Sequence, residues 1–273
     1  ISGSTISNNA ASNGGGIWNS GSLGISSSTL SGNTASYYGY GYGYGGSGGG
    51  IFNSGSLSLS DSTLSGNTAS DGGGLWNNNS LSVTGSTIAN NRATNGAGLF
   101  NTGTIATNIT STTFTGNSAS TNGGGIYNSG TLTVSSSTIG GDSLSVNTAT
   151  NGGGIWNNSS LSITGSTISN NTATGTAPGT GGGGLFNTGT LTVTSSTISG
   201  NSARYGGGIF NSGSVSVSGS TISGNSAGIN GGGGIFNTGS LSISDSTISG
   251  NSASGGGGIF NTGSLSISSS TIS

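Results

Sequence analysis

The amino-acid sequence predicts an all-β fold, a β-solenoid of about ten coils with three short strands in each coil. Three observations predict it. A glycine-rich block followed by Ile or Leu, an aromatic residue and Asn recurs ten times, and the shortest interval between blocks is 24 residues. Apolar and polar residues alternate within each repeat, as in strands with one buried face. Glycine supplies 61 of the 273 residues, and charged residues make up only 2%.

The ninth repeat shows where the strands are expected. Leu241 and Ile243 alternate with serines, and Ile248 is flanked by polar residues. This period of two is typical of strands, while Gly, Asn and Ser favour the corners between them. We expect residues 1–273 to form a single β-solenoid domain in which every residue lies above its equivalent in the next coil. Two alternatives stay open: the chain is one subunit of a filament, or it is an excerpt of a longer solenoid.

Asparagine occupies two positions in every repeat. The first column contains Asn19, Asn53, Asn77, Asn101, Asn128, Asn157, Asn187, Asn211, Asn237 and Asn261. The second contains Asn9, Asn33, Asn67, Asn91, Asn117, Asn147, Asn171, Asn201, Asn225 and Asn251. A catalytic amide would be needed once and not ten times. We therefore interpret both columns as structural ladders of hydrogen-bonded amides.

The composition argues against catalysis. There is no His or Cys, so neither a familiar catalytic triad nor a zinc site can form. Asp61 and Asp245 share one repeat position but lie seven coils apart, too far for the carboxylate pair of a glycoside hydrolase. We predict no enzyme activity, no cofactor and no metal. No basic patch favours nucleic acid, and no apolar run approaches the roughly 18 residues of a membrane-spanning helix.

An aromatic column is the first candidate binding surface. It contains Trp18, Phe52, Trp76, Phe100, Tyr127, Trp156, Phe186, Phe210, Phe236 and Phe260. Each ring follows an inward Ile or Leu, so alternation predicts that it points outward. Two interpretations stay open: a corner or a loop covers the rings, or they form an apolar stripe that binds a partner or stacks on sugars.

A threonine column is the second candidate surface. Thr precedes the third-strand apolar residue in every repeat, from Thr5 to Thr271, and a Ser two residues later completes a Thr-x-Ser lattice. Regular threonine lattices on β-solenoids resemble those of ice-binding proteins. The alternative interpretation is that Thr is a favourable exposed strand residue.

A tyrosine-rich insertion is a candidate interchain loop. Its aromatic residues are Tyr37, Tyr38, Tyr40, Tyr42 and Tyr44. Such a segment suits contacts with another chain or with glycans. The alternative is a solvent-exposed loop without a partner.

The two ends of the sequence carry the same strand pattern. Ile1 aligns with Ile267, and Ile6 aligns with Ile272. Open solenoid ends present unpaired strand edges, and polar capping coils are not apparent at either end. We therefore expect these residues to support end-to-end stacking of copies into a filament.

The repeats resemble a known family. The segment Phe114-Thr115-Gly116-Asn117 matches the FxxN signature, and the glycine blocks are similar to the GGA[ILV] signature, of the polymorphic outer-membrane-protein repeats. The resemblance implies a right-handed parallel β-helix, export, a surface or adhesin role, and no catalytic residue. We predict an extracellular structural β-solenoid, a filament-forming fibre or adhesive stalk, with copies of itself and cell-surface carbohydrate as candidate partners. The alternatives are an ice-binding protein and, more distantly, a polysaccharide-active enzyme.

Overall fold

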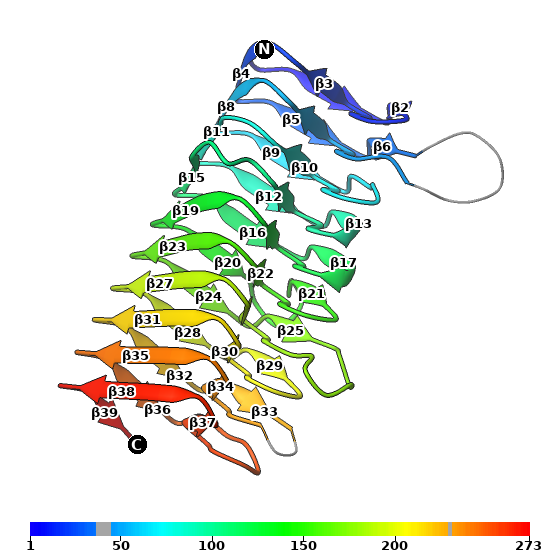
Figure 1. Ribbon diagram of the computed structural model, residues 1–273. Coiled ribbons are helices and arrows are strands. Elements are labelled where there is room, and N and C mark those ends of the chain that lie inside the picture. The colour runs from blue at the N-terminus through cyan, green and yellow to red at the C-terminus, as the bar shows by residue number, and fades with distance from the viewer. Residues whose placement is uncertain (37–44, 229–230) are drawn as a thin grey trace.

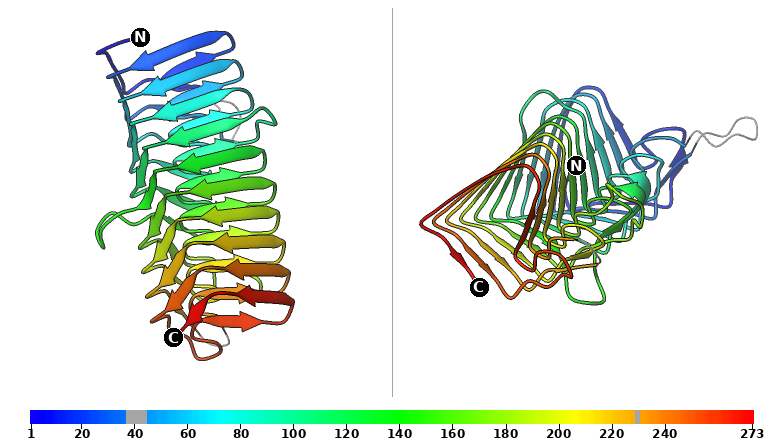
Figure 2. Two further views of the ribbon diagram at one scale, coloured as in Figure 1. Left: turned by 90° about the vertical axis from the view of Figure 1, so that its left-hand side faces the viewer. Right: turned by 60° about the horizontal axis from the view of Figure 1, so that its bottom comes forward.

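The computed structural model describes residues 1–36, 45–228 and 231–273 (Figure 1). The described chain is an all-β parallel β-solenoid, which confirms the predicted fold class. Its coils stack into a rod with the N-terminus at one end and the C-terminus at the other (Figures 1 and 2). Among the described residues there is no helix of the length and hydropathy that a membrane crossing requires.

Three sheets run the length of the rod. Sheet 1 holds the Ile/Leu–aromatic–Asn strands β3 (Ile17–Asn19), β7 (Ile51–Asn53), β10 (Leu75–Asn77), β14 (Leu99–Asn101), β18 (Ile126–Asn128), β22 (Ile155–Asn157), β26 (Leu185–Asn187), β30 (Ile209–Asn211), β34 (Ile235–Asn237) and β37 (Ile259–Asn261). Sheet 2 holds the longer alternating strands β4 (Ser22–Ser26), β8 (Ser56–Ser60), β11 (Leu81–Thr84), β15 (Thr107–Thr110), β19 (Thr131–Ser135), β23 (Ser160–Thr164), β27 (Thr190–Thr194), β31 (Ser214–Ser218), β35 (Ser240–Ser244) and β38 (Ser264–Ser268). Sheet 3 holds the threonine strands β1 (Thr5–Ser7), β5 (Thr29–Ser31), β9 (Thr63–Ser65), β12 (Thr87–Ala89), β16 (Thr113–Thr115), β20 (Thr138–Gly140), β24 (Thr167–Ser169), β28 (Thr197–Ser199), β32 (Thr221–Ser223), β36 (Thr247–Ser249) and β39 (Thr271–Ile272).

A fourth short strand adds to the three predicted ones in most coils. Sheet 4 holds β13 (Arg92–Asn95), β17 (Ser118–Asn122), β21 (Thr148–Ala149), β25 (Thr172–Ala173), β29 (Ser202–Ala203) and β33 (Ser226–Ala227), and β2 (Ala10–Ala11) pairs separately with β6 (Thr34–Ala35). Small side chains give these segments a weak sequence signal, and only pairing with the coils above and below defines them as strands. The loops that leave this side of the rod include the insertion at 175–180, and they project together (Figure 1).

Every strand pairs in parallel with its equivalents one coil away. Ile155 is opposite Leu185 in sheet 1, and Thr167 is opposite Thr197 in sheet 3. The predicted columns are therefore real columns, with neighbouring coils about 4.8 Å apart. One continuous apolar cluster fills the rod, from Ile25 to Ile248, with side chains from sheets 1, 2 and 3.

The glycine blocks allow the chain to turn tightly inside this stack. A Cβ on Gly153 would lie 2.4 Å from the carbonyl oxygen of Thr172, and one on Gly208 would lie 2.6 Å from the carbonyl oxygen of Gly234. Both contacts are with backbone, which cannot move away as a flexible side chain can. The Gly208 position is accordingly glycine in every coil, whereas the Gly153 position accepts alanine in one coil, where Ala97 is buried.

Candidate functional site

The aromatic column forms stacked rings along sheet 1. Neighbouring rings are nearly parallel, with centroids 4.2–5.2 Å apart, in three runs: Trp18–Phe52–Trp76, Phe100–Tyr127–Trp156 and Phe186–Phe210–Phe236–Phe260. Offset stacks of this kind stabilise by about 0.5–1.5 kcal/mol per pair beyond their burial. The column therefore reinforces the contact between coils.

Exposure along the aromatic column is uneven. Trp18, which stacks on one neighbour, is 56% exposed, whereas Phe186 and Phe210 are 7% and 5% exposed. The other rings are half-buried. Inside each run the ring faces cover one another, so the edges are what solvent reaches. Phe186 and Phe210 stack in register with the rest of the column and are outside the apolar core cluster, so the column keeps one direction although these two rings are buried. A partner for this stripe stays a prediction, and stacking on sugars would require the unstacked face of a ring at the end of a run, such as Trp18.

Both predicted asparagine ladders are present, and they are buried except at the two ends of the rod. In the first, the Nδ2 of Asn128 donates to the Oδ1 of Asn157 at 2.7 Å, and that residue donates to the next ladder member, Asn187, at 2.7 Å. In the second, both the backbone N–H and the Nδ2 of Asn171 donate to the Oδ1 of Asn201 at 2.9 Å. Among the described residues, no buried side-chain nitrogen or oxygen lacks a hydrogen-bond partner. The amides are thus fully used in holding the coils together.

A third ladder, made of hydroxyls, was missed by the sequence reasoning. The residue before each sheet 3 threonine is a Ser or Thr, and nine of these eleven residues are buried: Ser28, Ser62, Ser86, Thr112, Ser137, Ser166, Ser196, Ser220 and Ser246. Each hydroxyl donates within its own coil and accepts the backbone N–H of the preceding coil, as the Oγ of Ser196 does from Ser166 at 3.1 Å. The invariant Ser/Thr-Thr pair of every repeat was the available signal.

A fourth, shorter ladder runs beside the glycine blocks and begins at a carboxylate. The Nδ2 of Asn95 donates to Asp71 at 3.0 Å, Asn122 donates to Asn95 at 3.1 Å, and Asn151 donates to Asn122 at 3.1 Å. A carboxylate only accepts hydrogen bonds, which fixes the direction of the chain of amides.

The pKa of Tyr127 is raised, first because burial disfavours the phenolate and then because of the negative charge of Asp71.

The threonine lattice lies on the outer face of sheet 3. Its threonines are in register through all eleven strands, as in Thr5 opposite Thr29 and Thr247 opposite Thr271. The second row is less regular, because Ala89, Thr115 and Gly140 replace its serines in three coils. Most of the threonines are half-buried, so the lattice is only partly open to solvent.

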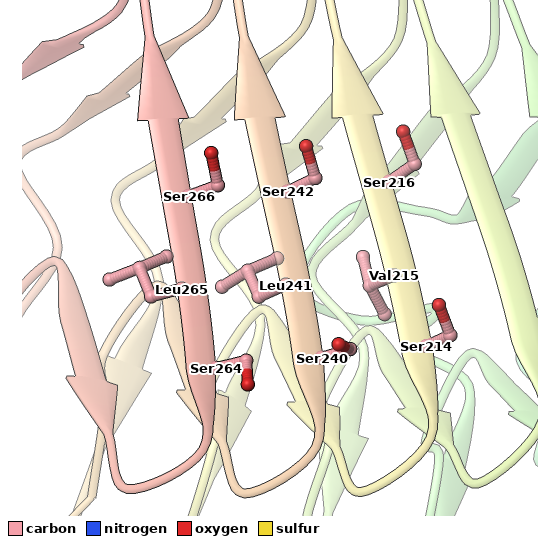
Figure 3. A pocket seen from close by; sticks show the side chains of 9 residues that line it. All are labelled: Ser214, Val215, Ser216, Ser240, Leu241, Ser242, Ser264, Leu265 and Ser266. Carbon is pink, nitrogen blue, oxygen red and sulfur yellow. The ribbon is translucent and has the colours of Figure 1, made fainter.

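The outer face of sheet 2 carries a shallow trough of about 300 Å³ near the C-terminal end. Figure 3 shows its lining on β31, β35 and β38: two rows of serine side chains on either side of Val215, Leu241 and Leu265. The serines are Ser214, Ser216, Ser240, Ser242, Ser264 and Ser266. No charged side chain lines this trough, and its polar side chains are all serines.

The remaining predicted residues have different outcomes. Ile1, Ile267 and Ile272 are 48%, 40% and 47% exposed, and Ile6 is partly buried against the core. The alignment of Ile6 with Ile272 is confirmed, because Ile6 pairs with the Leu30 column that ends at Ile272. The tyrosines of the candidate interchain loop, Tyr37, Tyr38, Tyr40, Tyr42 and Tyr44, lie outside the described residues.

Stacking of one copy on another stays a prediction, and the structure defines its geometry. A junction that pairs β39 with β1 would continue sheet 3 without a break. Sheet 1 would lack one strand there, because β37 precedes β39 in the last coil whereas β3 follows β1 in the first. Sheet 2 would lack most of a strand for the same reason, because only Ser2, of the described residues ahead of β4, pairs with this sheet. The expected end-to-end contact would therefore match sheet 3 but leave gaps in sheets 1 and 2.

Acidic residues do not gather anywhere in the described chain. No group of three or more His, Cys, Asp or Glu side chains within residues 1–36, 45–228 and 231–273 is placed to hold a metal. Asp61 and Asp245 occupy the same left-handed corner position, with φ of 47° and 49°, in coils far apart. The structure thus brings columns together and leaves the acidic residues scattered.

Comparison with known proteins gives one match. The family described as the Chlamydia polymorphic membrane protein repeat matches residues 111–129, which run from the corner before β16 to the turn after β18. Comparisons with curated proteins and with solved structures give no match. Together with the parallel β-solenoid, this match shows that the chain is built from β-helix repeats resembling those of the polymorphic membrane protein family.

Proposed function

We propose that the chain is a non-enzymatic structural rod of the cell exterior, working as a fibre or an adhesive stalk. One observation carries the proposal: the same core, amide and hydroxyl columns recur coil after coil, and their polar groups bond to neighbouring coils. Such chemistry builds length and rigidity, and a unique catalytic cluster is not needed. The family name of the matching repeat, a membrane protein, supports a cell-surface location.

Surface exposure on cells that make the protein tests this proposal directly. An antibody raised against residues 1–273 should label intact cells, and electron micrographs of the purified chain should show straight rods. Labelling that requires permeabilised cells would refute the exterior location. Compact particles in place of rods would refute the structural role.

Self-association and glycan binding are the finer parts of the proposal. With a net charge of only −2, little long-range repulsion opposes contact between copies. Sedimentation of residues 1–273 at high micromolar concentration should reveal fibres if sheet 3 continues from copy to copy. A stable monomer would refute filament formation but not the proposal that the chain is a structural rod. Affinity electrophoresis in gels containing uncharged polysaccharides would test the carbohydrate partner.

Ice binding is the second candidate, and the unbroken threonine column favours it. Among the described residues, no threonine hydroxyl of this column on β20, β24 or β28 bonds to another part of the chain. The double substitution Thr138→Lys plus Thr167→Lys should abolish thermal hysteresis if this face binds ice. The matched pair Ser162→Lys plus Thr192→Lys, on sheet 2, should retain it. No hysteresis in the unmodified chain would remove this candidate.

A further inference from the structure

The main-chain bonds between coils run in both directions. At the corner beside sheet 3, the N–H of Thr197 donates back to the carbonyl of Ser166, while the N–H of Gly200 donates forward to the carbonyl of Ser223. The main chain alone therefore gives neither neighbour of a coil an advantage. Any asymmetry between the two neighbours comes from the side-chain ladders.

In the two ladders that flank sheet 3, the side-chain acceptor oxygens serve donors of one neighbouring coil, the preceding one. In the second asparagine ladder, the Nδ2 of a coil donates to the Oδ1 of the following coil from Asn9 to Asn251, and the backbone N–H does so in every coil but that of Asn147. The same Nδ2 groups also donate back to a carbonyl of the preceding coil, as Asn201 does to Ile168. In the hydroxyl ladder, the backbone N–H of a coil points to the hydroxyl of the following coil, from Ser4 to Ser270. Buried backbone donors of each coil thus depend on side chains that belong to the next coil.

The consequence appears when one side chain is removed. Truncating Asn201 to Ala would remove one hydrogen-bond partner from each of three groups in the preceding coil. These groups are the backbone N–H of Asn171, the Nδ2 of Asn171 and the carbonyl of Ile168. The following coil loses less, since the backbone N–H of residue 201 remains and still reaches the Oδ1 of Asn225 at 3.0 Å. An unfilled buried N–H is rarer and costlier than a carbonyl oxygen with one bond fewer.

The first asparagine ladder does not reverse this asymmetry. If Asn187 is truncated, the Nδ2 of Asn157 keeps two carbonyl acceptors, those of Ser159 and Thr190, and the Oδ1 of Asn211 keeps the N–H of Gly213. Neither neighbour is left with an unfilled side-chain group. The direction of coupling between coils is therefore set by the two ladders beside sheet 3.

We propose that coupling along the rod is one-way: a lesion in one coil loosens the coil before it and spares the coil after it. A damaged rod then stays ordered on the C-terminal side of the lesion and opens on the N-terminal side. In an exposed structural rod, loss of order would then spread from a lesion only toward the N-terminus.

Native-state hydrogen exchange of Asn201→Ala tests the proposal. Amides of β24, in the preceding coil, should exchange roughly ten-fold faster or more than in the unmodified chain, the effect expected for unfilled buried donors. Amides of β32, in the following coil, should be unchanged. Equal acceleration on both sides, or acceleration of β32 alone, would overturn the proposal.

A milder pair keeps the test decisive if Asn201→Ala does not fold. Ser196→Ala removes the acceptor of Ser166 N–H and retains the N–H that bonds to Ser220. Ser196→Thr keeps the hydroxyl, and Thr112 already occupies this column. The alanine variant should loosen β24 and not β32, and the threonine variant should loosen neither. A symmetric response to Ser196→Ala, or none, would count against one-way coupling.

Discussion

Replacing Asn157 with Asp should destabilise the rod at neutral pH and do so much less in acid. The Nδ2 of Asn157, a fully buried residue, donates to the Oδ1 of Asn187 at 2.7 Å and to the carbonyls of Ser159 and Thr190 at 3.1 and 3.2 Å. A carboxylate would place an acceptor oxygen against these three acceptors. Each unmade bond costs about 1–3 kcal/mol, so the free energy of unfolding should fall by at least about 3 kcal/mol.

The pH dependence follows from the same geometry. Burial among carbonyl oxygens favours the neutral carboxyl, so the folded variant holds its proton to a higher pH than the unfolded chain, whose pKa is about 3.9. The penalty is complete above the folded pKa and disappears as the pH falls below the unfolded value. Acidification should therefore narrow the gap between Asn157→Asp and the unmodified chain.

Urea denaturation followed by far-UV circular dichroism, at neutral pH and at about pH 3, measures this effect. Asn158→Asp is the matched control, since it makes the same charge change one residue away at an exposed position. It should alter the free energy of unfolding by no more than about 0.5 kcal/mol. Equal unfolding midpoints for the two variants at neutral pH would refute the ladder argument. A loss of unfolding free energy in Asn157→Asp that is as large at about pH 3 as at neutral pH would also refute it.

Three further outcomes are expected. Ile198→Lys puts an unpaired charge at a fully buried site and should unfold the rod or open it locally, seen as lost circular dichroism and protease sensitivity. Gly208→Ala should lower the melting temperature, because its Cβ would lie 2.6 Å from the carbonyl oxygen of Gly234. Asp71→Asn should lower the pKa of Tyr127, which burial and then this carboxylate raise, in an absorbance titration read against Tyr127→Phe. The stability contributed by the neutral phenol is complete below about pH 10 and is lost as the pH rises through the raised pKa.

Matched controls separate these effects from general sensitivity to substitution. Thr192→Lys adds the same charge on the exposed face of sheet 2 and should leave the fold intact. Gly24→Ala adds the same methyl group where nothing lies within 4 Å, and should not lower the melting temperature. The packing argument would be contradicted if Thr192→Lys lost as much structure as Ile198→Lys. It would also be contradicted if Gly24→Ala lowered the melting temperature as much as Gly208→Ala. An unmoved Tyr127 titration in Asp71→Asn would show that burial alone raises its pKa.

The sequence by itself determined the solenoid and its columns. Alternation such as that of Leu241 and Ile243, repeated at a 24-residue interval, admits only short strands stacked in register. Because each coil meets another copy of itself, one repeat also predicts its own environment, and the two asparagine ladders follow from that. The sequence also shows directly that the chain contains no His and no Cys.

The tertiary structure alone decided which polar residues are buried and how far each ring is exposed. Ser196 looks like a corner serine in the sequence, yet it is 4% exposed and receives a backbone N–H from another coil. Phe210 and Trp18 share one column, yet their exposures are 5% and 56%. The number of stacked neighbours does not decide this, since Phe186 stacks on one ring and is 7% exposed. The physical reason is that a linear pattern specifies which way a side chain points, whereas burial and hydrogen bonding depend on what the adjacent coils and loops bring beside it.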